Sequence, residues 1–414
     1  MTRRIFTGGQ VFDGTGSPAT KADVVVEDGR VVEVGLGLDG DEAVDCSGAT
    51  VFPGFFDCHV HVMMSGVDVL RQLQTPFSYP FYEAVHNLRR TLVQGITHVR
   101  DAGGADLGVA EAVRNGLIAG PRMHISISMI SQTGGHGDGW HVCGAEVPHL
   151  QPHPGRPRTI VDGPDEMRHK VRELLRDGAD VIKVATSGGV LSARDDPQHP
   201  HFRPAELDVL VEEAEAAGVA VMAHAQSTEG IKAAVRAGIR SIEHGIFLDE
   251  EAIDLMLERG TWLVPTLSAP RAVLDAVAGG AALPEAMLAK AVAVQNVHDA
   301  SVARAAEAGV RIAMGTDTGV GQHGTNLGEL PLMAGLGMSP EQVWRSTTLE
   351  AARLLAVDNG FGSLEPGKVA DLVVLDGEAT DLTGLAGRVR EVYRDGELVA
   401  ADGATVEAGV LPRS

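Results

Sequence analysis

The chain has 414 residues, a hydrophobic fraction of 44% and a formal net charge of −22. This length exceeds that of a single typical domain, so we expect one large domain and a smaller one. An acidic surface disfavours nucleic acid and anionic membranes as partners. The N-terminus lacks the features of a signal peptide, and no apolar run approaches the roughly 20 residues that span a bilayer. We therefore expect a soluble cytoplasmic protein.

The three cysteines are too few and too scattered for a disulfide framework or a cysteine-based zinc site. Short Val-rich strands joined by turns are predicted near both ends of the chain. Asp28-Gly29 separates two apolar runs, which is typical of a β-hairpin with a type I′ turn. VADLVVLDG and REVYRDGELVAADG repeat this pattern near the C-terminus. We expect residues 1–51 and 362–414 to form one small composite sheet domain.

Between these ends, in residues 52–361, candidate strands alternate with amphipathic helices such as RPAELDVLVEEAEAAG. This alternation implies a parallel sheet, and eight strands suggest a closed (β/α)8 barrel. An open doubly wound sheet is the alternative, but the glycine-rich nucleotide fingerprint of such a sheet is absent after the first strand. The candidate strands lie in TVFPGFFDCHVH, GITHVRDAGG, PRMHISISMIS, ADVIKVATSGG, VAVMAHAQS, IRSIEHGI, TWLVPTLSA and VRIAMGTDTG.

The first of these strands ends in a His-x-His pair, His59 and His61. Strand alternation predicts that Asp57, His59 and His61 point into the barrel, with Cys58 outward. Two imidazoles at i and i+2 on one strand face can share a metal ion. The pair taken alone is equally compatible with two structural histidines.

Four further strands carry metal-binding residue types where barrel active sites lie. Lys183 sits inside an apolar strand, where a lysine is costly to bury unless it is paired or modified. His224 and His244 end the fifth and sixth strands, and Asp317 ends the eighth. Each has a structural alternative, such as a snorkelling lysine or a helix-capping aspartate. Their joint occurrence at one end of one barrel favours a metal centre.

The segments FPGFFDCHVH, IKVATSGG, AHAQ, IEHG and GTD together resemble the amidohydrolase superfamily, in its branch with two metals bridged by a carboxylated lysine. The resemblance covers nearly the whole chain, including VFDGTG and GSLEPGKVADLVVLD. In that superfamily these terminal segments form a β-sandwich beside the barrel. The resemblance implies an α/β fold, a (β/α)8 TIM barrel with a small β-sandwich domain. VRDAGG, SQTGGHGD, KVATSGGV and IEHG look like the subgroup of Xaa-Pro dipeptidases (prolidases) and Xaa-Arg/Lys carboxypeptidases.

The resemblance also implies two divalent metal ions, with zinc favoured by the nitrogen and oxygen ligands. Lys183, carboxylated by CO2, would bridge both ions, and its carbamate would remove the problem of an unpaired buried ammonium. A hydroxide bridging the metals would attack the substrate carbonyl. Asp317 would act as general acid/base between this hydroxide and the leaving amine. The remaining ligands divide between a more buried ion (His59, His61, Asp317) and a second ion (His224, His244).

A long irregular insert, residues 131–162, follows the third strand, and loops of this length are usually lids or binding loops. It supplies His136, a candidate electrophile or carboxylate-binding group. Gln226 stands where prolidase-like relatives often have Tyr and carboxypeptidase-like ones His, which leaves the substrate open. Arg194 and His323, in the loops after the fourth and eighth strands, are further candidate substrate contacts. Arg100 is expected to pair with an acidic neighbour inside the fold.

The leading hypothesis is a hydrolase of an amide or peptide bond in a small substrate, such as a dipeptide of Xaa-Pro type or an N-acyl amino acid. The alternative is a hydrolase of cyclic amides, like imidazolonepropionase, or of aryl and xenobiotic amides. A non-catalytic scaffold relative is a distant alternative, because such a protein would have lost metal ligands and all six are present here. We expect a homo-oligomer that binds neither nucleic acid nor membrane.

Overall fold

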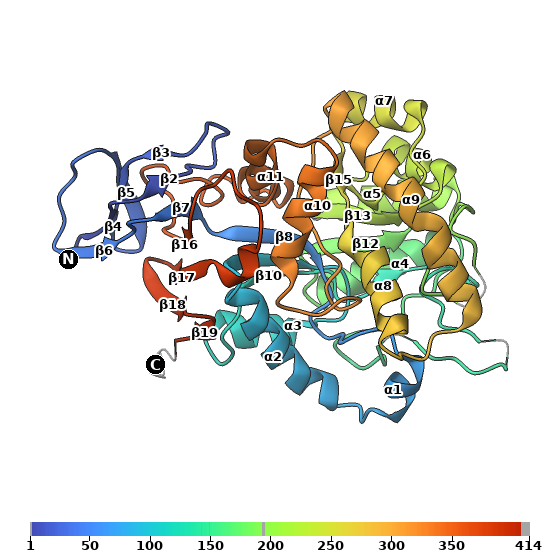
Figure 1. Ribbon diagram of the computed structural model, residues 1–414. Coiled ribbons are helices and arrows are strands. Elements are labelled where there is room, and N and C mark those ends of the chain that lie inside the picture. Colours follow the sequence, from blue (N-terminus) through green and yellow to red (C-terminus); the bar gives the residue numbers. More distant parts are fainter. Residues whose placement is uncertain (1, 142, 149, 193–194, 407–414) are drawn as a thin grey trace.

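A computed structural model describes residues 2–141, 143–148, 150–192 and 195–406. A helix-wrapped barrel forms one end of the molecule, and a smaller all-β unit forms the other (Figure 1). Within these described ranges, none of the helices combines the length and apolar character that crossing a bilayer requires. The predicted combination of a (β/α)8 barrel with a β-sandwich is confirmed, and the barrel carries the site.

The barrel strands run parallel and follow one another in chain order around the barrel. The third predicted strand is split in two, and its first half pairs with the strand before it while its second half pairs with the strand after it. The strands are β8 (Phe55–Val60), β9 (Ile96–Asp101), β10 (Arg122–Ile125), β11 (Met129–Ile130), β12 (Val181–Ala185), β13 (Ala220–Ala225), β14 (Ser241–His244) and β15 (Trp262–Val264).

The eighth predicted strand, residues 310–319, closes the barrel without forming a regular strand. It makes an isolated bridge to β15 at Ile312 and another to β8 at Thr318. Gly315 allows the segment to lie close to its neighbours, because a Cβ there would lie 2.4 Å from Val264 Cγ1. At Asp317 the φ of 61° is incompatible with an extended strand. The segment therefore passes β8 in a kinked path that brings Asp317 over the end of the barrel.

Helices follow most of the strands and cover the outside of the barrel (Figure 1). Ser227 and Asp249 show why two of them begin where they do, because each side chain accepts a hydrogen bond from a backbone N–H of the first turn. The helices are α1 (Val69–Gln74), α2 (Tyr79–Leu92), α3 (Leu107–Arg114), α4 (Pro164–Arg176), α5 (Pro204–Ala216), α6 (Thr228–Ala237), α7 (Glu250–Arg259), α8 (Ser268–Ala278), α9 (Glu285–Ala308), α10 (Glu329–Gly335), α11 (Pro340–Ser346) and α12 (Leu349–Leu354), with 3-10 turns η1 (Asn326–Gly328) and η2 (Leu385–Gly387).

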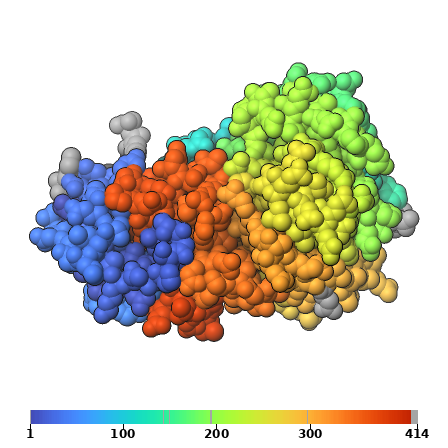
Figure 2. All heavy atoms as spheres, turned by 90° about the horizontal axis from the view of Figure 1, so that it is seen from above, coloured from blue at the N-terminus to red at the C-terminus, as the bar shows by residue number. Residues whose placement is uncertain are grey.

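The all-β unit contains two sheets, ordered β5-β4-β1-β6 and β19-β18-β17-β16-β7-β2-β3. The second sheet joins both ends of the chain, whose atoms also meet in Figure 2. Asp28 and Gly29 both have positive φ, so the predicted hairpin turn is confirmed. The strands of the all-β unit are β1 (Arg4–Thr7), β2 (Gln10–Val11), β3 (Thr20–Lys21), β4 (Asp23–Glu27), β5 (Arg30–Gly35), β6 (Glu42–Asp45), β7 (Ala49–Pro53), β16 (Leu372–Asp376), β17 (Val389–Arg394), β18 (Glu397–Ala401) and β19 (Ala404–Thr405).

The domain bounds expected from the sequence, 1–51, 52–361 and 362–414, stay a prediction. Strand β7 runs across the first of these bounds, so the junction is a continuous strand rather than a linker. Trp344 of α11 packs at this junction, with its ring 4.4 Å from that of Phe52 and 5.3 Å from that of Phe55. Its indole N–H donates to the carbonyl of Ala379 at 2.7 Å. One buried side chain thus joins the barrel to the β-sandwich.

Trp344→Ala should lower the free energy of unfolding by about 3–5 kcal/mol, because it empties a buried aromatic site and orphans the Ala379 carbonyl. Urea denaturation followed by circular dichroism measures this. Trp140→Ala is the matched control, since Trp140 is 44% exposed and its removal should change the free energy by less than about 1 kcal/mol. Equal losses in the two variants would contradict this account of the junction.

Candidate metal centre

A cavity of about 320 Å³ opens at the carboxyl end of the barrel strands. Parallel strands all end at this rim, so side chains far apart in the sequence meet there. The structure brings all six sequence-predicted ligands into the lining of this one cavity; their role as ligands stays a prediction. They are His59, His61, Lys183, His224, His244 and Asp317.

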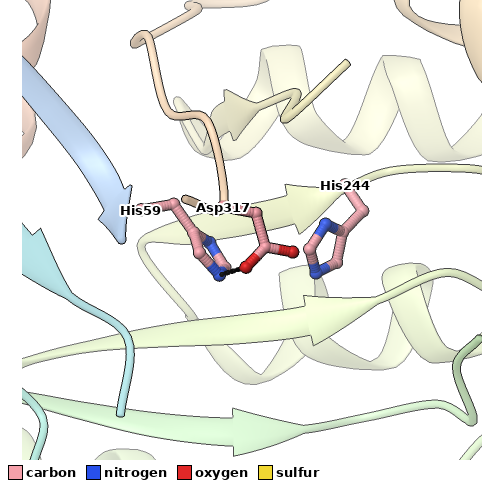
Figure 3. A group of neighbouring side chains, drawn as sticks. All are labelled: His59, His244 and Asp317. Atoms are coloured by element: carbon pink, nitrogen blue, oxygen red, sulfur yellow. Dashed lines mark ion pairs between the residues drawn. The ribbon is translucent and has the colours of Figure 1, made fainter. Parts of the chain in front are cut away.

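Three of these side chains form the tightest group. Ligand atoms of His59, His244 and Asp317 lie within 4.8 Å of one another, an arrangement that could hold a metal ion. Figure 3 shows the Asp317 carboxylate between the two imidazoles, each from a different part of the barrel. Asp317 Oδ1 lies 3.5 Å from His59 Nε2 and 3.3 Å from His61 Nε2. The carboxylate therefore contacts more than one candidate ligand.

Three of the four candidate histidine ligands are held in fixed orientations by partners at Nδ1, whereas the fourth, His224, has its Nε2 3.1 Å from the Gly188 carbonyl. Such partners fix the ring and leave the other nitrogen free for a metal. In His59, His61 and His244 the Nδ1 atom lies 2.7 Å from an oxygen atom, so the Nε2 atom faces the cavity. The partners are Glu243 Oε2 for His59, the Gly103 carbonyl for His61 and Thr266 Oγ1 for His244.

Glu243 is a residue of this site that the sequence reasoning missed. It is fully buried and accepts hydrogen bonds from Arg100 at 2.9 and 3.0 Å. The predicted pairing of Arg100 with an acidic neighbour is confirmed. Glu243 neighbours His244 in the IEHG segment, but its partners come from β8 and β9. Sequence alone could not show that its carboxylate reaches across the barrel to His59.

Lys183 on β12 has the least usual environment in the cavity. Its side chain is 1% exposed, and its Nζ has no hydrogen-bond partner among the described residues. Burial lowers the pKa of this amine to about 8, so the neutral form that reacts with CO2 is more populated near neutral pH than it is in an exposed lysine. Gln226 Oε1 is likewise buried and without a described partner. Buried polar atoms without a described partner, in a histidine-rich cavity, fit a site in which metal ions and a lysine carbamate would supply the missing partners.

Asp317 and His244 are both held in the left-handed backbone region, with φ values of 61° and 72°. Such conformations cost about 1–3 kcal/mol in non-glycine residues and concentrate at functional sites. Burial opposes ionisation of Asp317, yet the facing imidazoles of His59 and His61 hold the pKa of its carboxyl far below the usual range. Asp317 is therefore an anion aimed at the histidines.

The expectation that Asp57 shares the inward face with His59 was wrong. Asp57 is absent from the cavity lining, and its carboxylate accepts from the Thr316 hydroxyl at 2.6 Å and from Asn326 at 2.8 Å. The pairing register of β8 with β9 shifts between Asp57 and Val60, and this irregularity interrupts the simple alternation. Asp57 thus anchors the segment that carries Asp317.

His136 from the long insert lies in the cavity lining, as expected. Its ring stacks on that of His224 with centroids 4.1 Å apart, and its Nδ1 lies 3.4 Å from Asp195 Oδ2. Lys290 on α9 donates to Asp195 at 2.9 Å and to the carbonyls of Gly189 and Ser192 at the same distance. Sequence patterns do not reveal this network of contacts from α9 to the His136 imidazole, because its members are far apart along the polypeptide.

The other residues expected to contact the substrate differ in where they lie relative to the cavity. Gln226 lines the cavity. His323 does not: it is buried with its Nε2 3.0 Å from the Met64 carbonyl, behind the rim. Arg194 lies outside the described residues. His298 on α9, which sequence reasoning missed, lines the cavity with its Nε2 2.9 Å from the carbonyl of His244.

Comparison with known proteins agrees with the fold and the cavity. Residues 50–399 match the amidohydrolase family, and the chain belongs to that family. Ochratoxinase of Aspergillus niger is 34% identical over 393 residues, which cover 90% of this chain and 81% of the relative. The crystal structure of that ochratoxinase superposes with a TM-score of 0.83 at 30% identity, covering 96% of each chain.

Two solved structures with similar folds carry small ligands. One is a Xaa-Pro dipeptidase with methionine bound in its active site, at 34% identity and a TM-score of 0.87, covering 96% of this chain and 99% of its own. The other is a prolidase complexed with N-methylphosphonate-L-proline, at 36% identity and a TM-score of 0.88, covering 97% of this chain and all of its own. The chain is therefore an enzyme, a hydrolase that acts on amide bonds.

Asp195 generates a prediction on acid stability. Burial would raise the pKa of its carboxyl, but His136 and Lys290 outweigh this and lower the pKa to about 2. A depressed pKa stabilises the fold above the ordinary value of 3.8, and this contribution of about 2 kcal/mol is lost as pH falls toward 2. Asp195→Asn should thus destabilise the protein near pH 7 and less so near pH 3, as measured by urea denaturation. Asp196→Asn, at the exposed neighbouring position, should show no such pH-dependent difference.

Proposed function

We propose that this chain is a two-metal hydrolase that cleaves an amide or peptide bond in a small substrate, either a dipeptide of Xaa-Pro type or an N-acyl amino acid. The observation that carries the proposal is Lys183, a buried amine without a described partner, facing a cavity lined by histidines and Asp317. An unmodified ammonium would be costly there, whereas a carbamate bridging two cations is fully compensated.

The metal ions would be held by nitrogen and oxygen atoms only, which suits zinc. His59, His61 and Asp317 would bind one ion, and His224 and His244 the other, with carboxylated Lys183 between them. Glu243 and Thr266 support two of these rings from behind, as partners of metal-binding histidines commonly do.

Bound metal ions would supply Lewis-acid polarisation of the carbonyl and a lowered pKa of water. Asp317 is placed to accept a proton from the attacking water on its carboxylate and to deliver it to the nitrogen of the leaving amine. His136, held through Nδ1 by Asp195, presents its other ring nitrogen to the substrate carbonyl or carboxylate. Gln226 offers an uncharged hydrogen bond to the same group.

The substrate assignment draws on the relatives named Xaa-Pro dipeptidase and prolidase, and on the ochratoxinase. Cyclic amides are the second candidate. The deciding experiment incubates the zinc-loaded protein with Xaa-Pro, Xaa-Arg/Lys and N-acyl amino acid libraries and, in parallel, with a set of cyclic amides. Cleavage in the first or third library supports the proposal, and cleavage restricted to cyclic amides would replace it.

Lys183→Met should reduce bound zinc from two ions per chain to one or none, because the bridging ligand is lost. Metal content is measured by atomic absorption on protein that has been exchanged into zinc and bicarbonate. Lys232→Met is the control, since Lys232 is a mostly buried lysine on α6, paired with Asp249 and Glu251 away from the cavity. Two ions in both variants would contradict the role of Lys183.

Asp317→Asn should lower kcat by about 10²–10⁴-fold, since the amide retains an oxygen ligand but transfers no proton. Steady-state kinetics and metal analysis on the same sample separate proton transfer from metal loss. Asp254→Asn, an exposed change on α7, should leave kcat unchanged. Near-normal turnover in Asp317→Asn with both metals bound would exclude this role.

A further inference from the structure

One wall of the cavity is an apolar cup that no step of the proposed mechanism uses. We define the cup by Val190, Ile246, Val273, Val294 and Val320, which pack as one hydrophobic cluster separate from the main barrel core. All five line the cavity, and none is more than 8% exposed. They come from the loops after β12 and β14, from α8 and α9, and from the segment after Asp317.

The cup lies directly against the candidate metal ligands. Ile246 follows His244 by two residues, and the backbone N–H of Val320 donates to the carbonyl of Asp317 at 3.1 Å. Residues so close in sequence to a ligand cannot be far from it in space. A group placed in the cup would therefore lie close to the candidate metal ligands.

Helix α9 presents two different faces at this wall. Val294 is 1% exposed and faces the cavity, whereas Val292, two residues earlier and a fraction of a turn away, is 58% exposed. Lys290 on the same helix binds the loop that carries Asp195. The inward face of α9 is thus fixed in position beside the candidate ligands, and it is apolar where it meets the cavity.

The charged side chains that line the cavity do not belong to the cup. Outside the six candidate ligands, the Asp, Glu, Lys and Arg residues that line it among the described ranges all belong to the insert 131–162. They are Asp138, Glu146, Arg156 and Arg158.

We propose that the cup receives an uncharged apolar side chain or acyl group attached to the scissile amide, and that Val294 is a determinant of this preference. The proposal rests on the proposed function and names its substrate class. Burying an apolar group there is favourable, whereas a Lys or Glu side chain would lose hydration without a described partner. Differences of this kind in an apolar pocket amount to roughly 10–200-fold in kcat/KM.

The test uses two substrate series on the zinc-loaded enzyme, Xaa-Pro and N-acetyl-Xaa, with Xaa as Gly, Leu, Phe, Lys or Glu. In at least one series, kcat/KM for Leu or Phe should exceed that for Gly, Lys and Glu by more than 10-fold. Val294→Asp should remove this preference, and Val294→Phe should shift it toward Gly by filling the cup. Val292→Asp and Val292→Phe are the matched controls on the exposed face and should keep the wild-type order.

A wild-type preference for charged or glycyl substrates would overturn the proposal, as would folded Val294 variants with an unchanged order. Calorimetric binding of N-acetyl-leucine and N-acetyl-lysine keeps the test independent of turnover. If neither series is cleaved, the proposed function fails, while tighter binding of N-acetyl-leucine that Val294→Asp abolishes still supports the cup. Equal binding of the two ligands would overturn it.

Discussion

The burial of one amine determines how the rim of this barrel is organised. Lys183 lies in a strand of buried apolar residues, and its nitrogen faces the cavity without a hydrogen-bond partner among the described residues. An ammonium in such a place is costly unless it is paired or modified. The supporting network follows from this constraint: Glu243 and Thr266 orient imidazoles, and Asp57 fixes the segment that carries Asp317.

Much of this could be predicted from the sequence. Strand alternation with helices indicates the barrel, and the rule that active sites lie at the carboxyl end of barrel strands indicates which residues converge. His59, His61 and Lys183 carry a local signal because their residue types are unusual in apolar strands. The resemblance to a known superfamily added the β-sandwich, and the structure agrees.

The features of the fold and the site that could not be predicted depend on three-dimensional geometry, which local sequence patterns do not encode. Asp57 was assigned to the wrong face because a register shift in β8 interrupts alternation. The eighth strand is not extended at Asp317, which adopts a left-handed conformation. Glu243, Lys290 and His298 act on partners from distant elements, so their roles emerge only after the chain has folded.

Helix α9 combines two tasks that are usually carried by separate elements. Its Val294 faces the part of the cavity where a substrate side chain would lie, and its Lys290 holds the loop that orients His136. Exchanging this helix to alter selectivity would therefore also disturb the alignment of an imidazole at the reacting end. A change of selectivity through this helix would have to vary Val294 while keeping Lys290, which narrows the routes by which new substrates can be acquired.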